Sequence, residues 1–115
     1  QQLARDKMRG HLFENFIITE ALKCMYNKGK ESNLYFYRDS NSVEVDLLIK
    51  NGSDYTAVEI KSSQTYHPDF QAGIRTLSTV MKDRITNKVI LYAGDFENET
   101  ADIKLLNYKK MNTVF

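Results

Sequence analysis

Three charged residues, Asp46, Glu59 and Lys61, stand in the middle of two apolar stretches, EVDLLIK and AVEIK. Two neighbouring carboxylates repel each other, and directly opposed like charges destabilise a β-sheet. A divalent cation such as Mg²⁺, which prefers carboxylate and carbonyl oxygens, would remove this repulsion. A lysine two residues after one acid projects on the same side of a strand, where it can orient water or stabilise charge on a phosphoryl group. The three residues therefore indicate metal-dependent chemistry on a phosphate.

The segment between these acids predicts a β-hairpin around Asn51-Gly52. A symmetric turn between Asn51 and Asp54 sets Asp46 directly opposite Glu59, whereas a two-residue Asn51-Gly52 turn makes the two acids diagonal neighbours. In either register both acids share one face, within side-chain reach. Alternation along the strands leaves the opposite face apolar, with Val45, Leu47, Ile49, Val58 and Ile60.

Each of these residues also has a simpler interpretation. Glu59 and Lys61 alone are typical of an exposed ion pair, which is worth about 0–1 kcal/mol. Asp46 alone could serve a local hydrogen-bond network among its apolar neighbours. Their common face is what favours the metal site over these alternatives.

A fourth acid, Glu14, lies in the string GHLFENFI of a predicted amphipathic helix. Alone it is typical of a glutamate in a first helical turn, where it interacts favourably with the helix dipole. Gly10, which precedes it, could permit a close approach of the helix to the sheet. Glu14 would then lie over the hairpin and join the other acids.

The elements that must position these residues follow from hydrophobic periodicity and turn residues. The predicted elements are helices at about 10–27 and 68–81 and strands at 34–38, 43–50, 55–62, 88–92 and 103–106, with a turn at 39–42. A strand, a crossover helix and a later strand favour a right-handed parallel connection. We therefore expect an α/β fold with a mixed central sheet and a helix on each face.

Length and composition predict one globular domain of 115 residues. Sixteen Lys and Arg balance fifteen Asp and Glu, so the net charge is +1 and any nucleic-acid site must be local. The single cysteine, Cys24, excludes an internal disulfide, and no apolar run approaches the ~20 residues of a bilayer crossing. We expect a cytoplasmic protein without a membrane partner. The start QQLARDKM, without Met or a signal pattern, predicts a fragment of a longer protein.

Together, the four charged positions resemble the PD-(D/E)xK phosphodiesterase superfamily, whose restriction-endonuclease-like fold has an α-β-β-β-α-β core. The strings GHLFENFI, LYFYRD, EVDLLI and AVEIKSS are similar, more narrowly, to the uncharacterised C-terminal domain found behind a P-loop ATPase module in prokaryotic AAA+ family proteins. The resemblance covers about residues 10–91. It implies a single nuclease-like domain over 1–115, with its core at about 10–92.

The resemblance implies a role for each residue: Glu14 is the helix acid, Asp46 the metal-bridging aspartate, Glu59 the second strand ligand and Lys61 the catalytic lysine. The Ile60 backbone carbonyl would also bind metal. The implied reaction is hydrolysis of a nucleic acid, DNA more than RNA, by water that one or two Mg²⁺ or Mn²⁺ ions activate. Candidates for binding phosphates or supporting the metal ligands, each equally typical of a solvated strand end or helix cap, are Arg38, Ser62, Ser63, Thr65 and Gln71.

The sequence departs from the resemblance at two points. Val45 stands where the superfamily name has proline, which changes little chemically. No GxxxxGK[ST] motif occurs, so ATP hydrolysis is not assigned to this chain, and an ATPase module would lie elsewhere in the same parent chain.

An alternative function is a non-catalytic module that keeps the nuclease fold and docks an AAA+ ATPase to nucleic acid or protein. The near-neutral net charge favours this alternative, whereas Lys61, which a docking module does not need, favours the enzyme. A small-molecule-binding α/β domain has little support, because the chain has neither a Gly-rich phosphate loop nor a nucleophile elbow. A homo-oligomer is compatible with the sequence.

Overall fold

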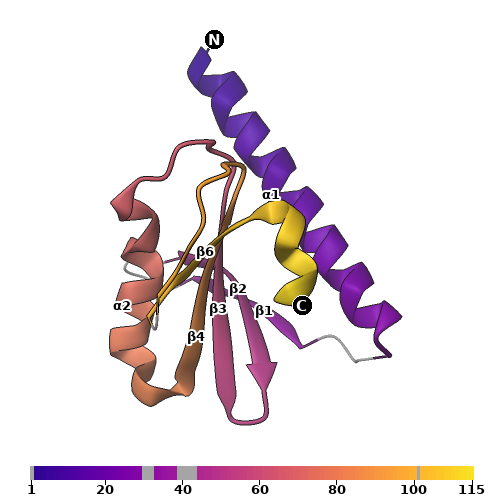
Figure 1. Cartoon of the computed structure of the whole chain (residues 1–115), viewed down its shortest axis with the longest axis vertical. Helices are drawn as coiled ribbons and strands as arrows, with labels where there is room; N and C mark the ends of the chain where they lie inside the picture. The colour runs from indigo at the N-terminus through magenta and orange to yellow at the C-terminus, as the bar shows by residue number, and fades with distance from the viewer. Residues whose placement is uncertain (1, 30–32, 39–43, 101) are drawn as a thin grey trace.

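The computed structural model describes residues 2–29, 33–38, 44–100 and 102–115. A central β-sheet separates two helical layers (Figure 1). Helix α1 (Gln2–Asn27) lies on one face with the 3-10 helix η3 (Tyr108–Thr113), and helix α2 (Ala72–Met81) lies on the other. The expectation of an α/β fold with a mixed sheet and a helix on each face is confirmed.

The sheet has six strands in the order β1-β2-β3-β4-β6-β5. Their bounds are β1 (Leu34–Arg38), β2 (Glu44–Asn51), β3 (Asp54–Lys61), β4 (Ile85–Tyr92), β5 (Asn98–Glu99) and β6 (Lys104–Asn107). The β1–β2, β2–β3 and β5–β6 pairs are antiparallel, and β3, β4 and β6 run parallel. The carboxyl ends of β3, β4 and β6 therefore meet at one edge of the sheet, where ligands commonly bind in α/β folds. The turn predicted at 39–42 and the start of the strand predicted at 43 lie outside the described residues.

Both helices begin elsewhere than their apolar patterns predict. Helix α1 starts at Gln2, ahead of the predicted start at Gly10, and projects past the sheet (Figure 1). The described side chains of its first two turns are exposed, so these turns need no apolar period. The second predicted helix opens as a 3-10 turn, η1 (Pro68–Gln71), before α2 begins, because Pro68 suits a first turn but lacks an N–H.

Apolar side chains fill the space on both sides of the sheet. Under α2 the buried cluster includes Val45, Leu48, Ala57, Phe70, Ile74, Leu77, Ile90 and Tyr92. Under α1 and η3 it includes Ile17, Ala21, Leu47, Ile49, Val58, Ile60, Leu91 and Phe115. Burying such a side chain stabilises the fold by about 1.5–3 kcal/mol, so the two clusters fix the distance of each helix from the sheet. No helix in the described ranges is both long and apolar enough to span a membrane.

The hairpin between β2 and β3 follows the first of the two registers predicted. Asn51 pairs with Asp54, and Leu47 pairs with Val58. The loop is therefore Gly52-Ser53, and Gly52 adopts φ 66°, a left-handed conformation that glycine reaches without strain.

Strand β2 carries an irregularity that the alternation of its residues did not predict. Tyr35 of β1 pairs with Leu48, but Tyr37 pairs with Val45, so three steps of β2 face two steps of β1. This bulge reverses the side-chain alternation beyond Leu47. Val45 consequently packs under α2 with Leu48, and the prediction that Val45 shares a face with Leu47 is wrong.

Candidate metal and phosphate site

Asp46 occupies the point at which β2 and β3 separate. The ladder between the two strands reaches Leu47–Val58, and beyond it the backbone N–H of Ile60 donates to Oδ2 of Asp46 at 2.7 Å. The carboxylate therefore takes the place of the next backbone acceptor of β2. This bond fixes Asp46 at the open end of the hairpin, beside the bulge.

Glu59 is buried next to Asp46, with 6% of its surface exposed. Burial, followed by the hydrogen bond and the charge repulsion between its carboxyl and Asp46, raises the pKa of Glu59 from 4.5 to about 9. Gly73 of α2 makes room for this group: a Cβ at Gly73 would lie 3.1 Å from Oε2 of Glu59 and 2.5 Å from the backbone oxygen of Glu44.

Glu14 reaches the same point from the opposite face. Its carboxyl hydrogen-bonds to Asp46, and burial together with the charge of Asp46 raises the pKa of Glu14 from 4.5 to about 7. Asp46 thus contacts an acid from α1 and an acid from β3. We refer to Glu14, Asp46 and Glu59 as the acid row.

Lys61 completes the group at the carboxyl end of β3. Its Nζ lies 5.6 Å from the centre of the Phe70 ring. Its charge lowers the pKa of both Glu59 and Glu14, although not enough to offset their burial. Lys61 also lines two shallow pockets, one of ≈ 270 Å³ beside Glu14 and one of ≈ 310 Å³ beside Glu59. The structure therefore brings all four predicted residues together, while their catalytic roles stay predictions.

The Ile60 carbonyl faces the same opening. In a β-strand, the N–H and C=O of one residue point to the same side, as the paired bonds of an antiparallel ladder require. Because the Ile60 N–H points to Asp46 on β2, the carbonyl of Ile60 also points toward β2, beyond the last ladder pair. A backbone oxygen thus accompanies the carboxylates.

Two of the other predicted residues lie beside the acid row. Ser62 lines the pocket that contains Glu14 and Lys61. Arg38 pairs with Glu44 at 2.9 Å, and Glu44 lines the pocket beside Glu59. A Cβ on Gly10 would meet the Ser62 hydroxyl at 3.8 Å, an ordinary contact, so the approach of α1 to the sheet does not require glycine there.

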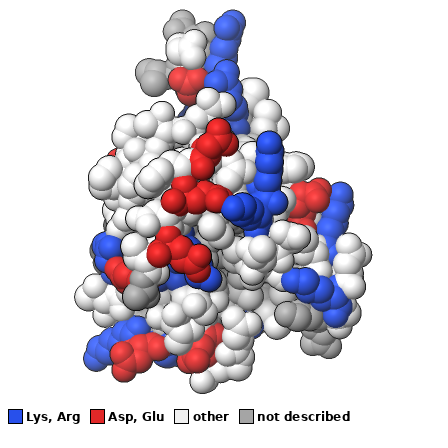
Figure 2. Space-filling view, viewed as in Figure 1, with Lys and Arg blue, Asp and Glu red and all other residues white. Residues whose placement is uncertain are grey.

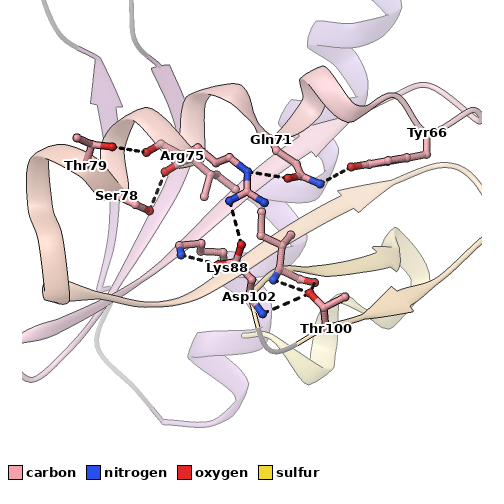
Figure 3. Close-up of polar contacts among 10 residues, drawn as sticks. Tyr66, Gln71, Arg75, Ser78, Thr79, Lys88, Thr100 and Asp102 are labelled. Carbon is pink, nitrogen blue, oxygen red and sulfur yellow. Dashed lines mark hydrogen bonds and ion pairs between the residues drawn. The ribbon is translucent and has the colours of Figure 1, made fainter.

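The remaining predicted residues serve local structure. Ser63 and Thr65 form a small turn, in which the Ser63 hydroxyl accepts from the Thr65 N–H at 3.0 Å and donates to its carbonyl at 2.8 Å. Gln71 donates to the Tyr66 hydroxyl and accepts from Nε of Arg75 at 2.8 Å (Figure 3). These bonds hold Gln71 in a network away from the acid row.

The structure adds two residues that the sequence reasoning passed over. Glu44 is close enough for its charge to raise the pKa of Glu14 further. Gly73 is the residue that admits α2 beside Glu59. The signal for Gly73 was present, because an isolated glycine inside a helical pattern usually has a packing reason.

The donor chemistry of the acid row fits a hard divalent cation, since it offers carboxylate oxygens and one backbone carbonyl. In the parts of the chain that the structure describes, no three His, Cys, Asp or Glu side chains surround a common point as metal ligands. The three acids instead contact one another through Asp46. A proton shared between neighbouring carboxyl groups allows them to contact one another in this way.

Charges elsewhere on the molecule are mixed. In the view of Figure 2, both acidic and basic side chains cover the visible surface, and the described residues there form no continuous basic stripe. This agrees with the net charge of +1. Attraction of a polyanion over the whole domain therefore contributes little.

Comparison with known families gives one match. The model of the family described as "Domain of unknown function (DUF4143)" matches residues 9–111. This match is compatible with the ATPase-associated C-terminal domain that the sequence resembles. A search of curated proteins gives no significant match. Because the family model covers most of the chain, from the turn of α1 before Glu14 into η3, the chain belongs to the DUF4143 family.

Proposed function

We propose that this domain is a metal-dependent phosphodiesterase of the PD-(D/E)xK type that hydrolyses nucleic acid, DNA in preference to RNA. The observation that carries the proposal is the acid row beside Lys61 at the open end of the β2–β3 hairpin. Like charges gathered in a half-buried place destabilise a fold unless they serve a ligand. The preference for DNA rests on the family resemblance alone.

Asp46, Glu59, Glu14 and the Ile60 carbonyl would hold Mg²⁺ or Mn²⁺. When bound, the ion would supply a Lewis acid that polarises a phosphate oxygen and makes water more acidic. The Ile60 N–H holds Asp46 in place, which leaves its second carboxylate oxygen for the ligand. Burial holds Glu59 against Asp46, and a cation would replace the proton that Glu59 retains there.

Lys61 would act on the substrate itself. Its side chain lines both pockets that flank the acid row, and within the described ranges no ion pair engages its ammonium group. An unpaired ammonium at this point can stabilise negative charge on a phosphoryl group and orient the attacking water. The ring of Phe70 supports the side chain from the α2 side.

The direct test combines metal binding with cleavage. Calorimetry with Mn²⁺ and cleavage of supercoiled and single-stranded DNA would compare the wild-type protein with Asp46→Asn. Asp102→Asn is the matched control, because it makes the same chemical change in an exposed carboxylate that pairs with Lys88 and Arg75. We expect Asp46→Asn to lose both Mn²⁺ binding and cleavage, and the control to keep both. Equal cleavage by wild type and Asp46→Asn would refute the proposal.

The second candidate is a docking module without catalysis, which the mixed surface charge favours. In this function the fold would join an ATPase module of the same parent chain to nucleic acid or to another protein. Binding would then persist in Asp46→Asn and in the presence of a chelator. Loss of binding under both conditions would exclude it and leave the enzyme.

A further inference from the structure

A further cavity, separate from the two pockets that flank the acid row, lies at the same edge of the sheet. It has a volume of ≈ 470 Å³, within the roughly 300–1,000 Å³ typical of ligand pockets. Its walls come from α1 and from the segments that follow β3, β4 and β6, and include Phe13, Gln64, Gly94, Asp95, Tyr108 and Lys109. This is the edge at which the parallel strands end, where open α/β sheets bind ligands.

Specific contacts build the floor of this cavity. A Cβ at Gly94 would lie 2.4 Å from both the Gln64 backbone oxygen and the Tyr92 ring, so only glycine lets these segments approach. The Asn107 side chain donates to the Gly94 carbonyl at 2.7 Å, and the Ala93 N–H donates to the Ser63 carbonyl at 3.1 Å. The ends of β3, β4 and β6 are thereby tied to one another before any ligand arrives.

The cavity carries polar groups that the fold does not use. The side chains of Gln64, Asp95 and Lys109 are exposed, and no hydrogen bond or ion pair engages their ends within the described ranges. An aromatic wall stands beside them, in which the Phe13 and Tyr108 rings meet edge to face at 5.3 Å. One ammonium, one amide, one carboxylate and aromatic surface together suit a nucleotide, whose phosphate, base edge and base face need these partners.

The cavity and the acid row adjoin along two segments. Phe13 of the cavity directly precedes Glu14 of the acid row on α1, and Gln64 follows Ser62 in the segment after β3. We propose that the cavity holds one unpaired nucleotide next to the phosphate at the acid row, so that the substrate is single-stranded nucleic acid. This inference rests on the proposed function for its position, but nucleotide binding is measurable without cleavage.

Shape and charge both favour a single strand over a duplex. A concave cavity of this size accepts a base only after the base has left its stack, which costs least in a strand that is already unpaired. A duplex presents its phosphates over a wide surface and recruits many lysines and arginines. The mixed charges of the visible face offer no such track among the described residues.

The test measures binding of a short fluorescein-labelled DNA strand, alone or annealed to its complement, in Ca²⁺ and in a chelator. We expect the single strand to bind about tenfold more tightly than the duplex. Lys109→Ala should weaken single-strand binding and reduce the slope of log affinity against log salt by about 0.7, the value for one lost phosphate contact. Lys50→Ala is the matched control, since Lys50 is an exposed lysine beside the hairpin loop at the far end of β2, and should leave the slope unchanged.

The outcomes separate this inference from the proposed function. If Lys109→Ala changes affinity and slope while the wild type cleaves nothing, the nucleotide cavity stands and the nuclease proposal fails. If the wild type cleaves DNA but Lys109→Ala binds like the control, the cavity assignment is overturned. Tighter binding of the duplex also overturns it. So does an NMR titration with the single strand in which the Gly94 and Tyr108 amide signals stay in place.

Discussion

Two clusters of ionisable side chains in this domain differ in the charges that they bring together. On the α2 side, Asp102 accepts from Lys88 and from Arg75, each at 2.9 Å, and Arg75 is held in turn by Gln71 (Figure 3). In the acid row, Asp46 contacts two further acids. The first cluster is exposed and pairs opposite charges, whereas the second is half-buried and gathers like charges.

The difference appears in the pKa shifts. The hydrogen bonds from Lys88 and Arg75 lower the pKa of Asp102, so folding favours its charged form. Burial and Asp46 raise the pKa of Glu59 and of Glu14, so folding favours their neutral forms. The ion pairs of Asp102 therefore stabilise the folded chain. The acid row needs bound protons or a cation to offset the repulsion between its carboxylates, which is typical of a functional site.

The largest expected effect is on the rate of DNA cleavage, and it distinguishes Lys61 beside the acid row from Lys88 of the Asp102 cluster. Lys61→Ala should lower the rate of DNA cleavage by about 10²–10⁴-fold, because an ammonium that acts in proton transfer or charge stabilisation is lost. Mn²⁺ binding by calorimetry should persist, since Lys61 is not among the proposed ligands. Lys88→Ala, which removes the lysine of the paired cluster, should leave the rate unchanged. A similar rate loss in both variants would mean that the two clusters do not differ in function.

The second prediction concerns stability against pH. Below pH 4.5 both folded and unfolded chains hold the proton of Glu59, but between 4.5 and about 9 only the folded chain holds it. The unfolded state therefore binds fewer protons in this window, and the free energy of unfolding falls as pH rises. Chemical denaturation of Glu59→Gln should show a flatter fall, because the amide does not ionise.

Mg²⁺ provides the control for this measurement. A cation binds the ionised acids, so it should raise the melting temperature of the wild type more at mildly alkaline than at mildly acidic pH. Glu59→Gln should lose most of this shift. An unfolding free energy that rises with pH across this window would contradict the account of the acid row.

The sequence predicted part of the acid row and nothing of the Asp102 cluster. The proximity of Asp46 and Glu59 followed from the Asn51–Asp54 turn, which is a local signal, although the bulge breaks the period-two pattern of β2 between Leu47 and Val45. The place of Glu14 beside them depends on how α1 crosses the sheet. No local pattern sets that crossing, which only Gly10 and the family resemblance suggested. The fold order was predictable for the same local reason, because each helix and strand carries its own period.

Two errors show where local patterns fail. Val45 changed faces because its pairing with Tyr37 of β1, a tertiary contact, imposes a bulge on β2. Gln71 was expected near the acid row, but it bonds Tyr66 and Arg75 instead. Its direction depends on the rotation of α2, which the contact of Gly73 with Glu44 and Glu59 fixes. Both the Val45–Tyr37 pairing and the contact of Gly73 with Glu44 and Glu59 join different helices or strands. Such contacts leave no periodic signal in the sequence.

The third prediction tests the contact of Gly73 with Glu44 and Glu59 by comparing alanine substitutions at two helical glycines. Gly73→Ala should destabilise the fold by about 1–3 kcal/mol, because its Cβ would meet the Glu44 backbone at 2.5 Å and must push α2 away from the acid row. Gly10→Ala is the matched change on α1, where the Cβ has room. It should stabilise the fold by about 0.5–1 kcal/mol through helix propensity. Urea denaturation measures both, and a stabilised Gly73→Ala would show that α2 does not pack so closely.

The smallest effect belongs to the paired cluster. Asp102→Asn should lower stability slightly, because Asp102 and Arg75 are exposed and solvent and salt screen the attraction between these charges. The lowered pKa of Asp102 means that its contribution is present above the unfolded pKa, near 3.8, and is lost as pH falls through the folded value. The loss in Asp102→Asn should therefore disappear in acid and in high salt, both followed by thermal unfolding. Its pH dependence is opposite in sign to that of Glu59→Gln. If the stability changes of Asp102→Asn and Glu59→Gln varied with pH in the same direction, ion pairing in the Asp102 cluster and repulsion in the acid row would not explain them.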